Sequence, residues 1–165
     1  MSLDFFDNKC KEKYRKDEIF GLCDKEDDNK AYSDISNPED WVATVKNNYK
    51  DVTFTPIDNC ITILKENAKD KESTCDGMLT FDNSIYLVEL KVRGTGGWLS
   101  DAINQLKNTI RLIRENQDIN YRYKKAFACN RKHPSFTTID NELSKRFFEE
   151  TDGFRIDAQA EIIIK

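Results

Sequence analysis

Two carboxylates and one amine are placed where they could act together on a single ligand. Asp76 precedes an apolar stretch, and Glu89 and Lys91 stand two residues apart within "IYLVELKV", which otherwise has the composition of a buried strand. Side chains on a β-strand alternate between its two faces, so Glu89 and Lys91 share one face. Two carboxylates in a half-buried place repel each other, and each loses hydration. A divalent cation such as Mg²⁺, which binds one or two carboxylates and keeps several waters, would relieve both costs.

A β-hairpin would bring Asp76 to the other two residues. We predict strands at about 75–81 and 85–92 around "FDNS". If Asn83 and Ser84 form a two-residue turn, Asp76 lies opposite Lys91 and diagonal to Glu89, within about 8 Å. An ordinary cross-strand ion pair at a sheet rim is the alternative, and such pairs contribute only about 0–1 kcal/mol.

The sequence after the hairpin predicts two helices and three strands. Residues 98–116 carry apolar side chains at helical spacing and predict a helix, with Ser100 or Asp101 as its N-cap. "YKKAFACN" predicts a strand beside the hairpin, and about 138–151 predicts a helix. The buried residues expected on that second helix are Leu143, Phe147 and Phe148, and two strands, "GFRIDA" and "AEIIIK", close the chain.

The region before the hairpin is less regular. Residues 4–16 are predicted to be helical, and "IFGLC", "AYSDI", "DVTFTPI" and "CITILKE" are predicted to be strands. "NPEDWVATVKNN" combines a helix start at Asn37-Pro38 with β-branched residues, and we favour a strand there. The 165 residues and 38% hydrophobic content are typical of one domain. We expect an α/β fold, with an N-terminal β-rich extension over about 1–70 and a core over about 74–130.

Asp76 followed by Glu89-Leu90-Lys91, with the last three on an apolar strand before a helix, resembles the PD-(D/E)XK nuclease superfamily. The resemblance covers about Thr74 to Cys129, although Cys75 stands where the proline of the motif's name would be. It implies a restriction endonuclease-like α/β sandwich on a mixed sheet with flanking helices. It also implies hydrolysis of nucleic-acid phosphodiester bonds, with DNA as the first candidate substrate and a homodimer as a possible assembly.

The resemblance also implies roles for individual residues. Asp76 and Glu89 would bind Mg²⁺ or Mn²⁺ together with the Leu90 carbonyl. Lys91 would position or deprotonate the attacking water, and Gln105 matches a glutamine that some members use. The family often adds an upstream glutamate, for which the candidates are Glu18, Glu39 and Glu66.

The charge distribution is uneven. Residues 1–90 carry a net charge of −8, residues 91–133 carry +7, and residues 134–165 carry −3. The basic stretch could hold phosphates. The acidic part favours an alternative, a non-catalytic protein-binding module such as an immunity or defence accessory protein. The residues predicted to bind nucleic acid are Arg93, Trp98, Arg131 and Lys132, although for Trp98 we favour the alternative role of a core or rim anchor for the helix.

Five cysteines without CxxC spacing favour reduced thiols in the cytoplasm. A zinc site of Cys10, Cys23 and His133 is an alternative. No apolar run reaches the roughly 20 residues that span a bilayer, and the first residues lack the pattern of a signal peptide. We therefore expect a cytoplasmic protein without a membrane partner.

Overall fold

The computed structural model describes residues 4–6, 9–24, 29–67, 69–92, 96–132 and 137–165 as two β-sheets and two α-helices. The larger sheet has the order β4-β5-β6-β7-β8, and the smaller one has the order β2-β1-β3-β9. The larger sheet comprises β4 (Thr53–Pro56), β5 (Gly77–Phe81), β6 (Ser84–Lys91), β7 (Tyr123–Asn130) and β8 (Arg155–Ala158). The smaller comprises β1 (Ile19–Cys23), β2 (Tyr32–Asp34), β3 (Ala43–Lys46) and β9 (Glu161–Ile163).

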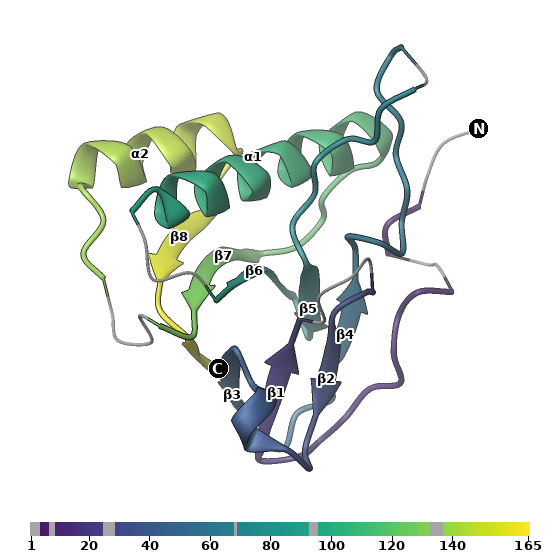
Figure 1. The fold of residues 1–165 in the computed structure, drawn as a ribbon, viewed down its shortest axis with the longest axis vertical. Coiled ribbons are helices and arrows are strands. Elements are labelled where there is room, and N and C mark those ends of the chain that lie inside the picture. Colours follow the sequence, from purple (N-terminus) through teal and green to yellow (C-terminus); the bar gives the residue numbers. More distant parts are fainter. Residues whose placement is uncertain (1–3, 7–8, 25–28, 68, 93–95, 133–136) are drawn as a thin grey trace.

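The three layers follow from the alternation of side chains along β6. Ile85 and Leu87 point into a core shared with the helices α1 (Trp98–Asn116) and α2 (Asn141–Glu150). Tyr86 and Val88 point into a second core, between the two sheets. Both helices therefore cover one face of the larger sheet, and the smaller sheet covers the other (Figure 1). The mixed α/β class is confirmed. The N-terminal strands are joined to the rest of the chain, because β9 pairs with β3 in the smaller sheet and β4 belongs to the larger one.

The larger sheet is mixed as predicted. β4, β5 and β6 pair antiparallel, and β6, β7 and β8 pair parallel. The connections between the parallel strands contain α1 and α2, as parallel pairing requires. β6 is the central strand, and seven of its eight residues are buried. The expectation that this stretch forms a buried strand is confirmed.

The helices agree with the sequence in position and differ in detail. α1 has the predicted bounds, but its N-cap is Gly97 rather than Ser100 or Asp101. Gly97 has a φ of +86°, which glycine adopts without steric cost. α2 begins after its N-cap Asp140, later than predicted. Phe147 is fully buried, whereas Phe148 is 40% exposed, so the prediction of a buried Phe148 is wrong.

Two further predictions fail in the N-terminal half. The described part of residues 4–16 contains no helix, because its backbone bonds to the β4 region instead: Glu12 N–H donates to Phe54 O and Arg15 N–H to Val52 O. "CITILKE" forms a turn after Ile57 and one isolated bridge, not a strand. "NPEDWVATVKNN" contains both a 3₁₀ turn, η1 (Pro38–Asp40), and the strand β3.

A disulfide joins Cys10 to Cys60, 50 residues apart in sequence, so the prediction of reduced thiols is wrong for this pair. It also removes the cysteine argument for a cytoplasmic protein, and it takes Cys10 out of the alternative zinc site. Cys23 is a buried free cysteine, and His133 lies outside the described residues.

Reduction of the Cys10–Cys60 disulfide is expected to lower the free energy of unfolding by about 4 kcal/mol, because the disulfide closes a loop with a sequence separation of 50 and reduction frees that loop in the unfolded chain. Urea denaturation with and without reductant measures the change. The double variant Cys10→Ser/Cys60→Ser should already be destabilised and should not respond to reductant. Equal midpoints for the oxidised and reduced wild-type protein would contradict the prediction.

Candidate active site

The candidate site lies where β5 and β6 separate. The last paired residues of the hairpin are Gly77 and Val88. Before Gly77 the chain still pairs with the continuation of β4, since Ile57 N–H donates to Asp76 O at 2.9 Å. Side chains then replace the backbone partners between β5 and β6. Asp76 N–H donates to Glu89 Oε1 at 3.1 Å, and Leu90 N–H donates to Asp76 Oδ2 at 2.7 Å.

The register of the hairpin differs from the prediction. Phe81 pairs with Ser84, so the turn residues are Asp82 and Asn83 rather than Asn83 and Ser84. Asp82 has a φ of +46°, the positive value that primed hairpin turns need at their first central residue. Asp76 therefore lies across from Glu89 rather than from Lys91. The partner moves by two residues, so Asp76 keeps the predicted face of the sheet.

Lys91 and Gln105 complete the cluster. The Lys91 Nζ lies 2.9 Å from Glu89 Oε2 and donates to Gln105 Oε1 at 2.6 Å. Gln105 comes from α1, so the helix contributes a side chain to the site that the sheet builds. The structure thus brings together the predicted Asp76, Glu89, Lys91 and Gln105, with the Leu90 backbone between them.

The two carboxylates are almost completely buried, at 8% exposure for Asp76 and 2% for Glu89. Burial, the adjacent Glu89 carboxylate and Asp24 hold the pKa of Asp76 well above its usual range. Burial raises the pKa of Glu89 to about 6, although the Lys91 ammonium opposes the shift. The pair is therefore costly to ionise without a further positive charge.

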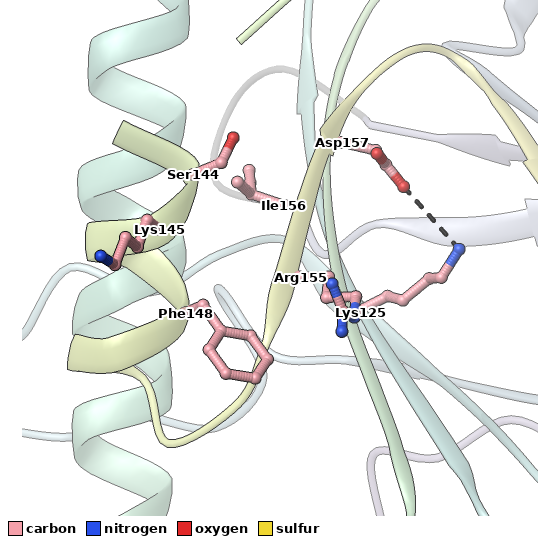
Figure 2. Close-up of a pocket in the computed structure, with 7 residues that line it drawn as sticks. All are labelled: Lys125, Ser144, Lys145, Phe148, Arg155, Ile156 and Asp157. Atoms are coloured by element: carbon pink, nitrogen blue, oxygen red, sulfur yellow. Dashed lines mark ion pairs between the residues drawn. The ribbon is translucent and has the colours of Figure 1, made fainter. Parts of the chain in front are cut away.

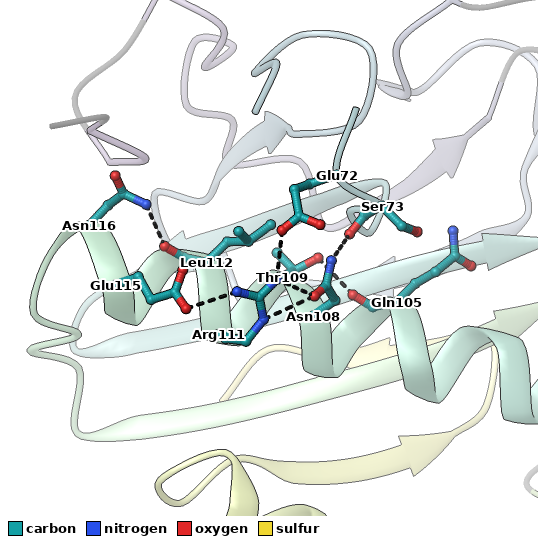
Figure 3. A network of polar contacts seen from close by, with 9 residues as sticks. All are labelled: Glu72, Ser73, Gln105, Asn108, Thr109, Arg111, Leu112, Glu115 and Asn116. Carbon is teal, nitrogen blue, oxygen red and sulfur yellow. Dashed lines mark hydrogen bonds and ion pairs between the residues drawn. The ribbon is translucent and has the colours of Figure 1, made fainter. Parts of the chain in front are cut away.

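A polar network on α1 holds the chain that leads into Asp76 (Figure 3). Thr109 Oγ1 accepts from Cys75 N–H at 2.6 Å and donates to Gln105 O at 2.8 Å. Asn108 Nδ2 donates to Ser73 O at 2.6 Å. Arg111 extends the network to Glu72 at 2.6 Å. These contacts fix Asp76 relative to the helix turn that carries Gln105.

The donors present suit Mg²⁺ or Mn²⁺. The described residues contain no group of three or more histidine, cysteine or acidic side chains placed to hold a metal. Two carboxylates are sufficient for Mg²⁺, which binds to proteins through one or two carboxylates and retains waters. The Leu90 carbonyl is available on the same side, because in antiparallel pairing a residue presents N–H and C=O to the same neighbour.

Of the four residues predicted to bind nucleic acid, those that the structure describes do not form a cluster comparable to that of Asp76, Glu89, Lys91 and Gln105. Arg93 lies outside the described residues. Trp98 is 8% exposed and packs in the core between the helices and the sheet, which agrees with an anchor and not with a stacking surface. The Arg131 guanidinium donates to the Asp40 and Trp41 carbonyls, so it ties the end of β7 to η1. Lys132 is exposed just beyond β7.

Three residues near the cluster had not been predicted. Asp24, just after β1, is an upstream acid whose charge acts on Asp76, whereas the proposed Glu18 accepts from Tyr49 Oη. Asn130, fully buried, pairs with Lys91 across β6 and β7. Thr109 supports Cys75 from the helix. Asn130 could have been found from the sequence, because it is a polar residue at the end of an apolar strand. Asp24 could not, because 52 positions separate it from Asp76.

Neither helix of the described chain has the length and apolar character needed to cross a bilayer. Comparison with known proteins yields no family model, no curated protein and no solved structure that matches this chain.

Proposed function

We propose that this protein is a metal-dependent nuclease of the PD-(D/E)XK kind, which hydrolyses nucleic-acid phosphodiester bonds with Mg²⁺ or Mn²⁺. The observation that carries the proposal is the cluster of Asp76, Glu89, Lys91 and Gln105 at the opening between β5 and β6. A buried acid, Asp76, whose ionisation is opposed by a second buried carboxylate, Glu89, with a lysine beside them, is more typical of a functional site than of a stabilising ion pair.

Each residue has a role that its contacts support. Asp76, Glu89 and the Leu90 carbonyl would hold the metal, which supplies Lewis acidity and a more acidic bound water. Lys91, the most exposed of the cluster's charged side chains at 17%, would orient the attacking water and offset charge on the phosphate. Gln105 holds Lys91 in place from α1. The net charge of +7 over residues 91–133 supports a polyanionic substrate, with DNA as the first candidate.

The restriction endonuclease-like architecture is part of the same proposal. The hairpin β5-β6, the helix α1 and the parallel strand β7 follow one another in the order that the resemblance implies. The smaller sheet packed on the other face would then be an addition to that core.

A cleavage assay tests the proposal. The purified protein is incubated with single-stranded, duplex and branched DNA and with structured RNA, in Mg²⁺, Mn²⁺ or EDTA. We expect at least one substrate to be cut in Mg²⁺ or Mn²⁺, and no cutting in EDTA. Absence of cleavage of every substrate, together with no Mn²⁺ binding by calorimetry, would refute it.

A protein-binding module is the second candidate, favoured by the net charge of −8 over residues 1–90. An acidic region of this kind could bind the nucleic-acid-binding site of a basic partner protein. In that case the carboxylate cluster would be structural, and a stable complex with a basic protein would form without metal.

A further inference from the structure

A basic and aromatic pocket lies at the edge of the larger sheet, between α2 and β8 (Figure 2). Its volume is about 460 Å³, and a second hollow of about 500 Å³ shares Lys125, Phe148 and Arg155 with it. We call the two together the α2–β8 pocket. Its lining residues are Arg122, Tyr123, Lys124, Lys125, Ser144, Lys145, Phe148, Gly153, Arg155, Ile156 and Asp157.

The pocket is strongly positive. Five of its lining residues are lysines or arginines, and one, Asp157, carries a carboxylate. The Lys125 Nζ is 3.8 Å from Asp157 Oδ2, so Asp157 offsets one of the five positive charges and leaves a net positive lining. A polyanion would therefore be attracted here, and each phosphate contact would release counterions.

Two exposed aromatic rings accompany the charge. Phe148 of α2 is 40% exposed, whereas its neighbour Phe147 is fully buried, and the Arg155 guanidinium lies 5.1 Å from the Phe148 ring centroid. Tyr123, at the start of β7, is 55% exposed, with Arg122 5.3 Å from its ring. Nucleic-acid bases stack on aromatic faces and on arginine planes, while lysines and arginines follow the phosphates.

We infer that the α2–β8 pocket binds single-stranded nucleic acid, with a base stacked on Phe148 and phosphates held by Lys125 and Arg155. The pocket lies at the amino end of β7, about 17 Å along that strand from Asn130, which pairs with Lys91. It would thus hold the substrate away from the position of cleavage. The inference rests on the proposed function only in identifying the bound strand as substrate, because the binding itself requires neither metal nor Asp76.

Fluorescence anisotropy with a labelled oligothymidylate, in EDTA to prevent cleavage, measures this binding. Phe148→Ala is expected to raise the Kd about tenfold for the oligothymidylate and to leave unchanged the Kd for an abasic oligomer of the same length. Arg155→Gln should weaken both ligands and reduce the slope of log Kd against log salt by about 0.7. Circular dichroism and thermal melting confirm that each variant is folded.

Tyr14→Ala and Lys13→Gln are the matched controls. Tyr14 is 61% exposed, and its neighbour Arg15 bridges Val52 beside β4, at the opposite edge of the larger sheet from β8. Neither control should change the Kd. Equal affinities of wild type and Phe148→Ala, no binding by wild type, or displacement by a mononucleotide as effective as by the oligomer would each overturn the inference.

The same experiments separate this inference from the nuclease proposal. Binding that depends on Phe148 in a protein that neither cleaves any substrate nor binds Mn²⁺ would support the pocket and refute the enzyme. Metal-dependent cleavage with binding that is indifferent to Phe148 and Arg155 would support the enzyme and refute the pocket.

Discussion

Lys91→Met is expected to reduce metal-dependent cleavage by about 10²–10⁴-fold, the usual effect of removing a positioned acid–base group. Lys91 is the charged member of the cluster that reaches solvent, and its Nζ contacts both Glu89 and Gln105. Because that ammonium also neutralises buried Glu89, the variant should lose stability as well. Initial rates at saturating Mg²⁺, measured beside urea denaturation, report the two effects separately.

A second variant separates chemistry from folding. Lys91→Arg keeps a positive charge next to Glu89 but changes the donor that faces the water, so it should retain most of the stability and still lose cleavage. Lys107→Met is the matched control, since Lys107 lies elsewhere on α1 and forms an ion pair with Glu150 of α2. If Lys91→Met cleaves at the rate of Lys107→Met, Lys91 has no catalytic role.

Asp76→Asn is expected to abolish metal binding while making the metal-free protein more stable at neutral pH. The asparagine Oδ1 can still accept from Leu90 N–H, so the backbone contact is preserved while the buried charge is removed. At 100 times its Kd, Mn²⁺ should stabilise the wild type by about 2.7 kcal/mol and should not stabilise the variant. Asp82→Asn, in the exposed turn of the same hairpin, should behave as wild type.

The pH dependence of stability gives an independent measurement on the same variant. Glu89 has a pKa of about 6 in the folded protein and about 4.5 when unfolded, so the folded state binds its proton more tightly. The contribution of Glu89 to the stability of the metal-free protein should therefore be greatest below about pH 4.5 and fall by about 2 kcal/mol as pH rises through 6. Asp76, whose pKa is also raised, adds to this fall.

Asp76→Asn should accordingly show a shallower decline than wild type over the same range. Urea denaturation in EDTA at a series of pH values measures both curves. Identical slopes for wild type and variant would show that Asp76 does not carry a buried charge. A structural ion pair would also predict that Asp76→Asn destabilises the protein, which is the opposite sign.

Much of the site could be read from consecutive residues. The alternation in "IYLVELK" places Ile85, Leu87, Glu89 and Lys91 on one face, and the structure confirms that face as the one covered by α1. The bounds of α1 follow from its apolar spacing, and Gln105 reaches Lys91 from it. These features depend on periods of two and 3.6 residues, which a local stretch of sequence carries completely.

The remaining features required the tertiary structure. The partner of Asp76 depends on the positive φ at Asp82, because one turn residue sets the register of the whole hairpin. The electrostatic effect of Asp24 on Asp76, the Cys10–Cys60 disulfide and the non-helical N-terminal segment depend on residues that are distant in sequence. The α2–β8 pocket joins β7, α2 and β8 in the same way. Periodicity assigns a residue to a face, but only the packing of remote segments, chosen by their combined burial and hydrogen bonding, decides which faces meet.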